Sequence, residues 1–207
     1  MITPWASQFR LQDLKILEEK EVFSGYSHIK QFTFQYPLFS GGTSQPIPRE
    51  VIFRPSAVTV LLIDPAEKKV VLVEQFRAGA LSNAAGPWLL ELVAGVCEEG
   101  ERPEETAYRE VKEETGCEIL SLIPICSYFT TPGISVEKIF IYCGKVKAPQ
   151  LNHQTFGIVE EGEDIKVCVL SVDEVFQLLA EGKIVSSPAL IGLQWLQLNF
   201  RTLHFPQ

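Results

Sequence analysis

Apolar and polar residues alternate in several short stretches of the chain, and this alternation predicts β-strands. Between residues 28 and 36, aromatic residues occupy every second position from Phe32 to Tyr36 with polar residues between them, which is the period of a half-buried strand. Apolar runs at residues 57–63 and 70–76 flank a turn-like DPAEKK segment and predict a hairpin. Two more apolar stretches are strand candidates: residues 119–129 and 138–146.

Two segments nearer the end of the chain carry the start and stop signals of helices. Ser171 and Glu174 have the spacing of a capping box, and the helix that they begin is expected to end near Gly182. Ser187 and Pro188 open another helix. Its large apolar residues are expected to pack in the core rather than to bind a cofactor: Leu190, Leu193, Trp195, Leu196 and Leu198.

A change of pattern near residue 50 divides the chain. Residues 1–50 are strand-rich and end in a segment punctuated by glycine and proline, whereas residues 51–207 alternate between strands and helices. We therefore expect an α/β fold with a main domain over residues 51–207 and a small β-rich unit over residues 1–50. So short a unit has a thin core, and it is expected to lean on the main domain or on a second copy of the protein.

The charged residues are unevenly distributed. The chain has 207 residues and a formal net charge of −8, which argues against a protein that binds nucleic acid or an anionic membrane surface through its charge. Residues 98–114 hold eight acids and three bases, and residues 160–164 hold four acids and no base. These two acidic clusters are therefore the candidates for chemistry.

The sequence shows no signal for leaving the cytoplasm. No apolar run reaches the roughly 18 residues of a membrane span, and the start of the chain lacks the basic end and apolar core of a signal peptide. Five cysteines, an odd number without a CxxC pair, indicate free thiols in a reducing compartment. We expect a cytoplasmic protein.

The first acidic cluster falls on a predicted helix. A proline at the first helical position and a glycine beyond the last delimit a helix over residues 103–115. On a helical wheel Glu110, Glu113 and Glu114 share an arc of about 100° that borders the apolar stripe. Such crowding of carboxylates is unfavourable unless a cation intervenes.

This arc predicts a site for a hard divalent cation. Mg²⁺ binds carboxylate oxygens and commonly uses few protein ligands together with substrate phosphates, so the arc suggests a Mg²⁺ or Mn²⁺ platform for phosphate chemistry. A solvated charged face, the alternative, would interleave acids with bases away from the core. Zinc fits less well, because the histidines are far apart and no Cys/His spacing suits it: His28, His153 and His204. A role for His153 beside the second cluster stays open.

Eight residues at fixed spacing then match a known pattern. They resemble the Nudix box: Gly95, Glu101, Arg109, Glu110, Val111, Glu113, Glu114 and Gly116. The box normally closes on an aliphatic residue, and this chain has Cys117, a small hydrophobic side chain, in that place. The resemblance implies a Nudix-type α/β/α sandwich around a mixed sheet, with a small N-terminal antiparallel β unit.

The resemblance also implies metal ligands. The box would form a loop–helix–loop that holds metal ions against a pyrophosphate. Glu110 and Glu114 would be the main ligands, and Ala94 would add its carbonyl oxygen. Glu113 would share the metal ion or orient it.

Other residues of the box would support these ligands. Glu101 and Arg109 would brace the loop and the helix by an ion pair, while contact of Arg109 with a phosphate is the alternative. Gly95 and Gly116 would have structural roles.

The resemblance extends beyond the box. Pro132 lies 16 residues after Gly116, a placement that marks the ADP-ribose pyrophosphatase branch, and residues 49–200 resemble bacterial members of that branch. This implies a Mg²⁺-dependent enzyme, with Mn²⁺ possible, that hydrolyses ADP-ribose to AMP and ribose 5-phosphate. It also implies a homodimer with exchanged N-terminal sheets.

The second acidic cluster gains a role from the same resemblance. Hydrolysis needs a base to activate water, and metal would occupy the carboxylates of the box helix. By alignment with the family the base is Glu161, with Glu163 close by. On the charge pattern alone, a solvated acidic loop is the alternative.

Substrate binding requires positive charge, because a site rich in carboxylates repels a pyrophosphate. Arg49, Arg54 and Arg77 are the candidates, and the resemblance places Arg49 and Arg77 where the family contacts phosphate or ribose. Tyr26 would stack on adenine, and Glu137 would hydrogen-bond the terminal ribose.

Two other functions remain open. One is a Nudix hydrolase for another nucleoside diphosphate sugar, such as GDP-mannose. The other is a non-catalytic nucleotide-sugar sensor, although sensors commonly lose box carboxylates that this chain retains.

Overall fold

The computed structural model describes residues 6–148, 154–157 and 162–205. The chain divides into two compact units, Met1–Arg54 with Phe129–Glu137, and Pro55–Tyr128 with Lys138–Gln207. The first division lies close to the change of pattern near residue 50. No sequence signal assigned residues 129–137 to the first unit.

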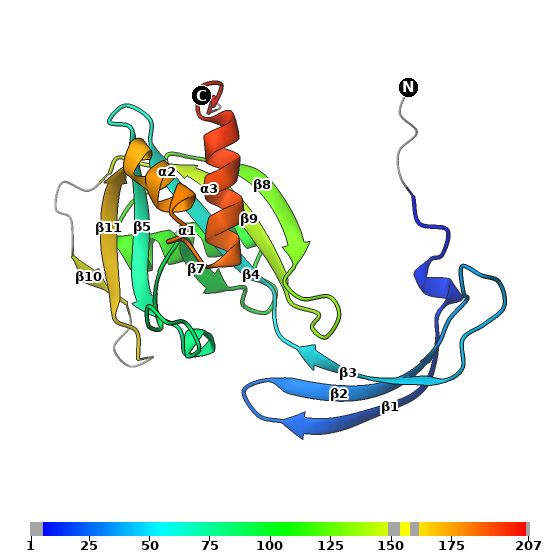
Figure 1. The fold of residues 1–207 in the computed structure, drawn as a ribbon. Helices are drawn as coiled ribbons and strands as arrows, with labels where there is room; N and C mark the ends of the chain where they lie inside the picture. Colours follow the sequence, from blue (N-terminus) through cyan, green and yellow to red (C-terminus); the bar gives the residue numbers. More distant parts are fainter. Residues whose placement is uncertain (1–5, 149–153, 158–161, 206–207) are drawn as a thin grey trace, which may run out of the picture. The chain divides into compact units, whose positions relative to one another are not determined.

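The first unit is a three-stranded antiparallel sheet (Figure 1). It contains the 3-10 turn η1 (Leu11–Asp13) and the strands β1 (Lys15–Ser24), β2 (His28–Gln35) and β3 (Ile47–Phe53). The alternating stretch at 28–36 is confirmed as β2, although only Phe32 in it is buried. β1 escaped prediction because all of its residues are exposed and it therefore lacks a buried face.

Residues 129–137 are joined to the first unit through β3. The backbone N–H of Ile52 donates to the Ile134 carbonyl at 2.7 Å, and the N–H of Val136 donates to the Ile52 carbonyl at 3.1 Å. These bonds explain why a segment so far along the chain belongs to the N-terminal sheet.

The second unit is built on an eight-stranded mixed sheet. Its strands are β4 (Ala57–Asp64), β5 (Lys69–Phe76), β6 (Trp88–Glu91), β7 (Val93–Val96), β8 (Ser121–Phe129), β9 (Lys138–Lys145), β10 (Thr155–Phe156) and β11 (Ile165–Ser171), with the turn η2 (Ala78–Ala80) after β5. The order is β10-β11-β5-β4-β9-β8, with β6 on β5 and β7 on β4. The predicted hairpin is confirmed as β4 and β5, and β4 runs parallel to β9.

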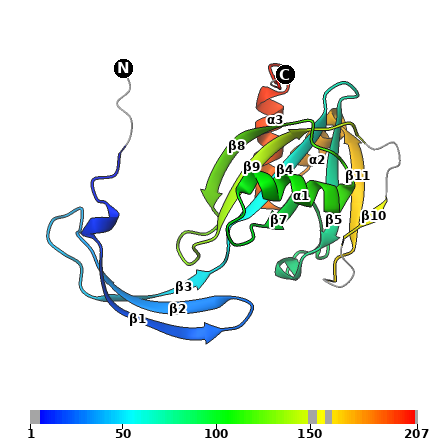
Figure 2. The ribbon, with the colours of Figure 1, turned by 180° about the vertical axis from the view of Figure 1, so that it is seen from behind.

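Three helices cover the two faces of this sheet. They are α1 (Pro103–Thr115), α2 (Val172–Ala180) and α3 (Ser187–Asn199), at the predicted places. Figures 1 and 2 show α2 and α3 on one face and α1 on the other. Along β4, Leu61 packs in the core beneath α2 and α3, whereas Val60 and Leu62 pack in the core beneath α1. The predicted α/β/α sandwich is confirmed.

One predicted core position is wrong. Leu193 and Leu196 of α3 are fully buried and Leu190 and Trp195 pack against them, but Leu198 is 85% exposed. Leu198 lies in the last turn of α3, beyond Leu196, which is the last buried residue of the helix. Among the described residues, none of the helices is long and apolar enough to cross a membrane.

The sheet also determines where α1 meets a strand. β4 pairs with β5 only over Leu62–Asp64, and before that point β4 pairs with β7 instead. The chain leaves β7 and enters α1 after a short acidic loop. Ala94 and Gly95 therefore lie against the helix that carries the acidic arc.

Candidate active site

The acidic helix begins and ends as its sequence predicts. Pro103 occupies the first turn, and the Arg102 N–H donates to the Glu105 carboxylate at 3.0 Å. Gly116 ends the helix with a φ of 66°, a left-handed conformation that favours glycine. Glu110, Glu113 and Glu114 are thereby held on the last two turns.

Glu114 is the most deeply buried of the three carboxylates. Its residue is 3% exposed, and its Oε2 accepts a hydrogen bond from the Ala94 N–H at 3.3 Å. Burial raises the pKa of Glu114 to about 8, and the nearby Glu110 and Glu163 charges act in the same direction. The positive charge of Arg77 opposes this shift.

Glu110 lies directly against Gly95. A Cβ at position 95 would come 1.8 Å from the Glu110 carboxyl carbon, so only glycine leaves room for this carboxylate. Burial raises the pKa of Glu110, while its pairing with Arg109 opposes the shift. The structural role expected for Gly95 thus has a specific cause.

Arg109 connects the carboxylates of the helix and the preceding loop. Its Nε and Nη2 donate to the two Glu101 oxygens at 3.1 and 3.0 Å, so the ion pair expected between these residues is present. Its Nη1 donates to Glu110 at 2.6 Å and to Glu113 at 3.2 Å. The Arg109 guanidinium lowers the pKa of Glu101 to about 2. Arg109 therefore offsets several negative charges at once.

The second acidic cluster reaches this site through Glu163. The Glu163 charge contributes to the raised pKa of both Glu110 and Glu114, after the larger effect of burial. Glu161 and His153 lie outside the described residues. The structure therefore brings one of the two predicted base residues to the acidic arc.

Arg77 follows β5, and its charge acts on Glu114. It lowers the pKa of Glu114, and its Nε donates to Glu91 Oε2 at 2.6 Å. Glu91 of β6 pairs with Val73 of β5 and is 8% exposed. Sequence reasoning missed Glu91; the signal was a lone acid within the apolar WLLELV stretch.

Three predicted substrate residues meet in the first unit. Arg54 Nε lies 3.4 Å from Glu137 Oε1, and Arg54 Cζ lies 5.7 Å from the ring centroid of Tyr26, which is 90% exposed. Thr130, which the sequence did not suggest, donates to Glu137 at 3.0 Å. Arg49 is exposed on β3, and its guanidinium donates to the Pro48 carbonyl.

Comparisons with known proteins agree on one family. A family model for the NUDIX domain matches residues 53–190. "ADP-ribose pyrophosphatase" of Haemophilus influenzae is 42% identical over 198 residues, covering 94% of this chain and 91% of that protein. "ADP-ribose pyrophosphatase" of Escherichia coli K12 is 37% identical over 195 residues, covering 94% and 93%. The chain belongs to the NUDIX domain family.

A solved structure shares the Nudix fold. "Crystal structure of ADP compounds hydrolase" aligns with a TM-score of 0.68 over 94% of this chain and all of that chain, at 20% sequence identity. At this identity the likeness concerns the fold alone. It agrees with the layered architecture around the mixed sheet.

The donor atoms on the Nudix helix suit a hard divalent cation. Two largely buried carboxylates, Glu110 and Glu114, lie one turn apart beside β7, and a bound cation would offset the cost of their burial. In this arrangement Arg109 donates hydrogen bonds to the Glu110 and Glu113 carboxylates. The described part of the chain contains no group of three or more His, Cys, Asp or Glu side chains that could hold a metal ion.

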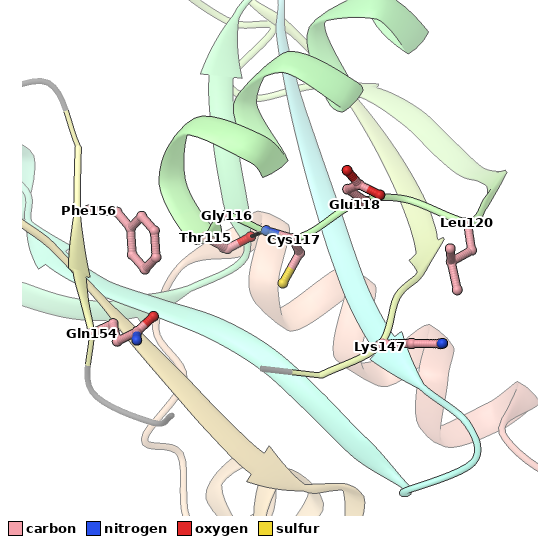
Figure 3. A pocket seen from close by; sticks show the side chains of 8 residues that line it. All are labelled: Thr115, Gly116, Cys117, Glu118, Leu120, Lys147, Gln154 and Phe156. Carbon is pink, nitrogen blue, oxygen red and sulfur yellow. Dashed lines mark hydrogen bonds between the residues drawn. The ribbon is translucent and has the colours of Figure 1, made fainter. Parts of the chain in front are cut away.

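A separate cavity lies at the far end of the Nudix helix. It has a volume of about 460 Å³ and is lined by residues following α1 together with Lys147, Gln154 and Phe156 (Figure 3). Gly116 is the only predicted site residue that lines it. The acidic arc is therefore not part of this cavity.

The raised pKa of Glu114 predicts a pH-dependent stability of the metal-free protein. The ordinary glutamate pKa is 4.5 and that of Glu114 is about 8, so the folded state binds this proton more tightly than the unfolded chain does. Stability from this group is therefore lost as pH rises between these values. In EDTA, the thermal unfolding temperature should decrease as the pH is raised from about 5 to about 8.

Glu114→Gln should flatten this profile, because it removes the titrating group. Glu105→Gln, an exposed position on the same helix, serves as the matched control and should keep the wild-type slope. An unchanged slope in Glu114→Gln would contradict the assignment, as would a flat wild-type profile. Added Mg²⁺ should raise the wild-type midpoint most at the alkaline end.

Proposed function

We propose that this Nudix hydrolase cleaves the pyrophosphate of ADP-ribose to AMP and ribose 5-phosphate in a Mg²⁺-dependent reaction, with Mn²⁺ as an alternative metal. The observation that carries the proposal is the pair of buried carboxylates, Glu110 and Glu114, held against β7. The similarity to ADP-ribose pyrophosphatases over nine-tenths of both chains supports this choice of substrate.

The metal would be held by Glu110, Glu114 and the Ala94 carbonyl, with Glu113 sharing or orienting it. Mg²⁺ supplies charge neutralisation at a pyrophosphate and lowers the pKa of bound water. Arg77, whose charge already acts on Glu114, adds a second positive charge near the developing negative charge. Glu91 fixes its guanidinium by the 2.6 Å hydrogen bond.

The reaction consumes one water. Its oxygen attacks one phosphorus, the bridging P–O bond breaks, and the leaving phosphate keeps the bond electrons. A carboxylate from the second acidic cluster accepts the proton of the attacking water. Glu161 is the proposed base on the family resemblance, and Glu163, two residues later, is the second candidate.

The exposed Tyr26 of the first unit would stack on adenine, while Glu137 would bind the terminal ribose. Arg54 orients both, because it contacts the Tyr26 ring and the Glu137 carboxylate. Arg49 would contact phosphate or ribose. These assignments, like a cytoplasmic location, are part of the proposal.

The first experiment measures phosphate released from AMP and ribose 5-phosphate by added phosphatase, over a panel containing ADP-ribose and GDP-mannose. Wild-type protein should prefer ADP-ribose and need Mg²⁺. Glu114→Gln should lower kcat at least about 100-fold at saturating Mg²⁺, because it removes an anionic ligand. Glu105→Gln should retain activity. Full activity of Glu114→Gln would contradict the metal assignment.

If the protein hydrolyses GDP-mannose faster than ADP-ribose, the proposed substrate is wrong but the protein is still a Nudix hydrolase. Binding of ADP-ribose without any turnover would instead favour the sensor. The three functions thus give three different outcomes in one assay.

The base assignment is tested by comparing two Glu→Gln variants, at positions 161 and 163. Glu161→Gln should lower kcat about 100-fold or more with little change in Mn²⁺ affinity, since a base acts in the chemical step. Glu163→Gln should have the smaller effect. A Glu161→Gln enzyme with normal kcat and raised KM would argue against the base role, and the reverse ranking would assign it to Glu163.

We further propose a homodimer with exchanged N-terminal sheets. In support, β1 leaves large apolar side chains exposed: Ile16, Leu17, Val22 and Phe23. Phe23→Asp should shift sedimentation equilibrium from dimer toward monomer. The control is Leu198→Asp, which changes an equally apolar exposed residue on α3 and should leave the dimer intact. A monomeric wild-type protein would overturn the proposal.

A further inference from the structure

Gln75 is a buried polar side chain whose amide nitrogen has no hydrogen-bond partner among the described residues. It lies on β5 and is 7% exposed, and the amide nitrogen, Nε2, is itself buried. A buried donor without an acceptor is unfavourable, and native structures contain few of them. Such a group needs an explanation outside ordinary packing.

Strand alternation places Gln75 on the active-site face of the sheet. Val71 and Val73 of the same strand pack in the core beneath α1, and successive odd positions continue on that face through Gln75 to Arg77. Figure 2 shows α1 lying over this face. Gln75 therefore lies about 7 Å along the chain from Arg77, the residue whose charge acts on Glu114.

The neighbouring strand leads to the same place. Glu74 pairs with Lys166 of β11, so Gln75 lies beside Ile165, the first residue of that strand. Glu163 precedes Ile165 by two residues, and its charge acts on Glu110 and Glu114. The register thus places Gln75 beside the start of β11, two residues after Glu163 in the chain.

No carboxylate among the described residues accepts a hydrogen bond from the Gln75 amide nitrogen. Glu91 accepts from Arg77, and Glu114 accepts from the Ala94 backbone. Because Nε2 is buried, the oxygen that it would bind must enter the same buried position. An amide adds no charge, so it can bind a phosphate oxygen without forming an ion pair with the surrounding glutamates.

We propose that Gln75 is a substrate-binding residue whose Nε2 donates a hydrogen bond to a pyrophosphate oxygen; this inference rests on the hydrolase activity proposed above. The substrate would supply the acceptor that Nε2 lacks within the described part of the chain. Gln75 on β5 and Arg77, two positions later in the chain, then contact the same pyrophosphate, one as a neutral donor and one as a cation.

The test variant is Gln75→Met, which keeps the side-chain length and removes the donor. It should lower kcat/KM for ADP-ribose about 10- to 100-fold, because a hydrogen bond to an anionic oxygen is lost. The Kd of the non-hydrolysable α,β-methylene analogue, measured by calorimetry with Mg²⁺, should rise by a similar factor. The unfolding midpoint without substrate should be no lower than in wild type, because an unpaired donor has been removed.

Thr59→Val is the matched control. The Thr59 hydroxyl is the other buried side-chain polar atom without a partner in the described part of the chain, but Thr59 lies between Ala57 and Leu61 on the opposite face of the sheet. Its removal should leave kcat/KM and analogue affinity unchanged. This control separates loss of a buried polar atom from loss of a substrate contact.

The remaining outcomes are distinct. Unchanged kcat/KM and analogue affinity in Gln75→Met would overturn the inference, and so would a clearly lower unfolding midpoint, which would make Gln75 structural. Weakened binding of Mn²⁺ alone, measured by electron paramagnetic resonance, would assign the amide to a metal-bound water instead. If wild type does not hydrolyse ADP-ribose, the proposed function fails, while analogue binding still tests the contact.

Discussion

The burial of carboxylates beneath the acidic helix is the constraint on which the rest of the site depends. Taking Glu110 and Glu114 out of water is costly, and the fold offsets this cost with the Arg109 guanidinium, the Ala94 N–H and the charge of Arg77. Gly95 lacks a side chain because the Glu110 carboxylate needs that space. Packing and electrostatics on α1 are therefore inseparable from its chemistry.

This arrangement explains why the surrounding strands carry polar residues on a face that is otherwise apolar. On this face, Val71 and Val73 of β5 are followed by Gln75 and then by Arg77, just after the strand ends. Glu91, on the strand paired with β5, holds Arg77 in place. The same face thus passes from a hydrophobic core to a site for an anionic ligand within a few residues.

Much of the fold and part of the site followed from local signals. Capping residues and apolar periodicity predicted all three helices and the β4–β5 hairpin, because these features act over a few neighbouring positions. β1 was missed because its residues are all exposed. Leu198 was wrongly assigned to the core because periodicity does not show where a helix extends beyond the core. The Glu101–Arg109 ion pair was predicted from the resemblance to the Nudix box. The contacts of Thr130 and Glu91 were not predicted, because neither residue belongs to a motif of that kind.

The sequence by itself determined the acidic helix, its end at Gly116, the places of the other two helices and the β4–β5 hairpin, and the residue types suited to a divalent cation and a pyrophosphate. Only the tertiary structure decided which charges meet. It buried Glu114 more deeply than its neighbours and exposed it to the charges of Glu163 and Arg77, which lie far apart in the sequence. It also left the Gln75 amide nitrogen without a partner among the described residues. The physical reason is that a pKa and an unmet hydrogen bond depend on distance and burial, which arise from contacts between residues far apart in the chain.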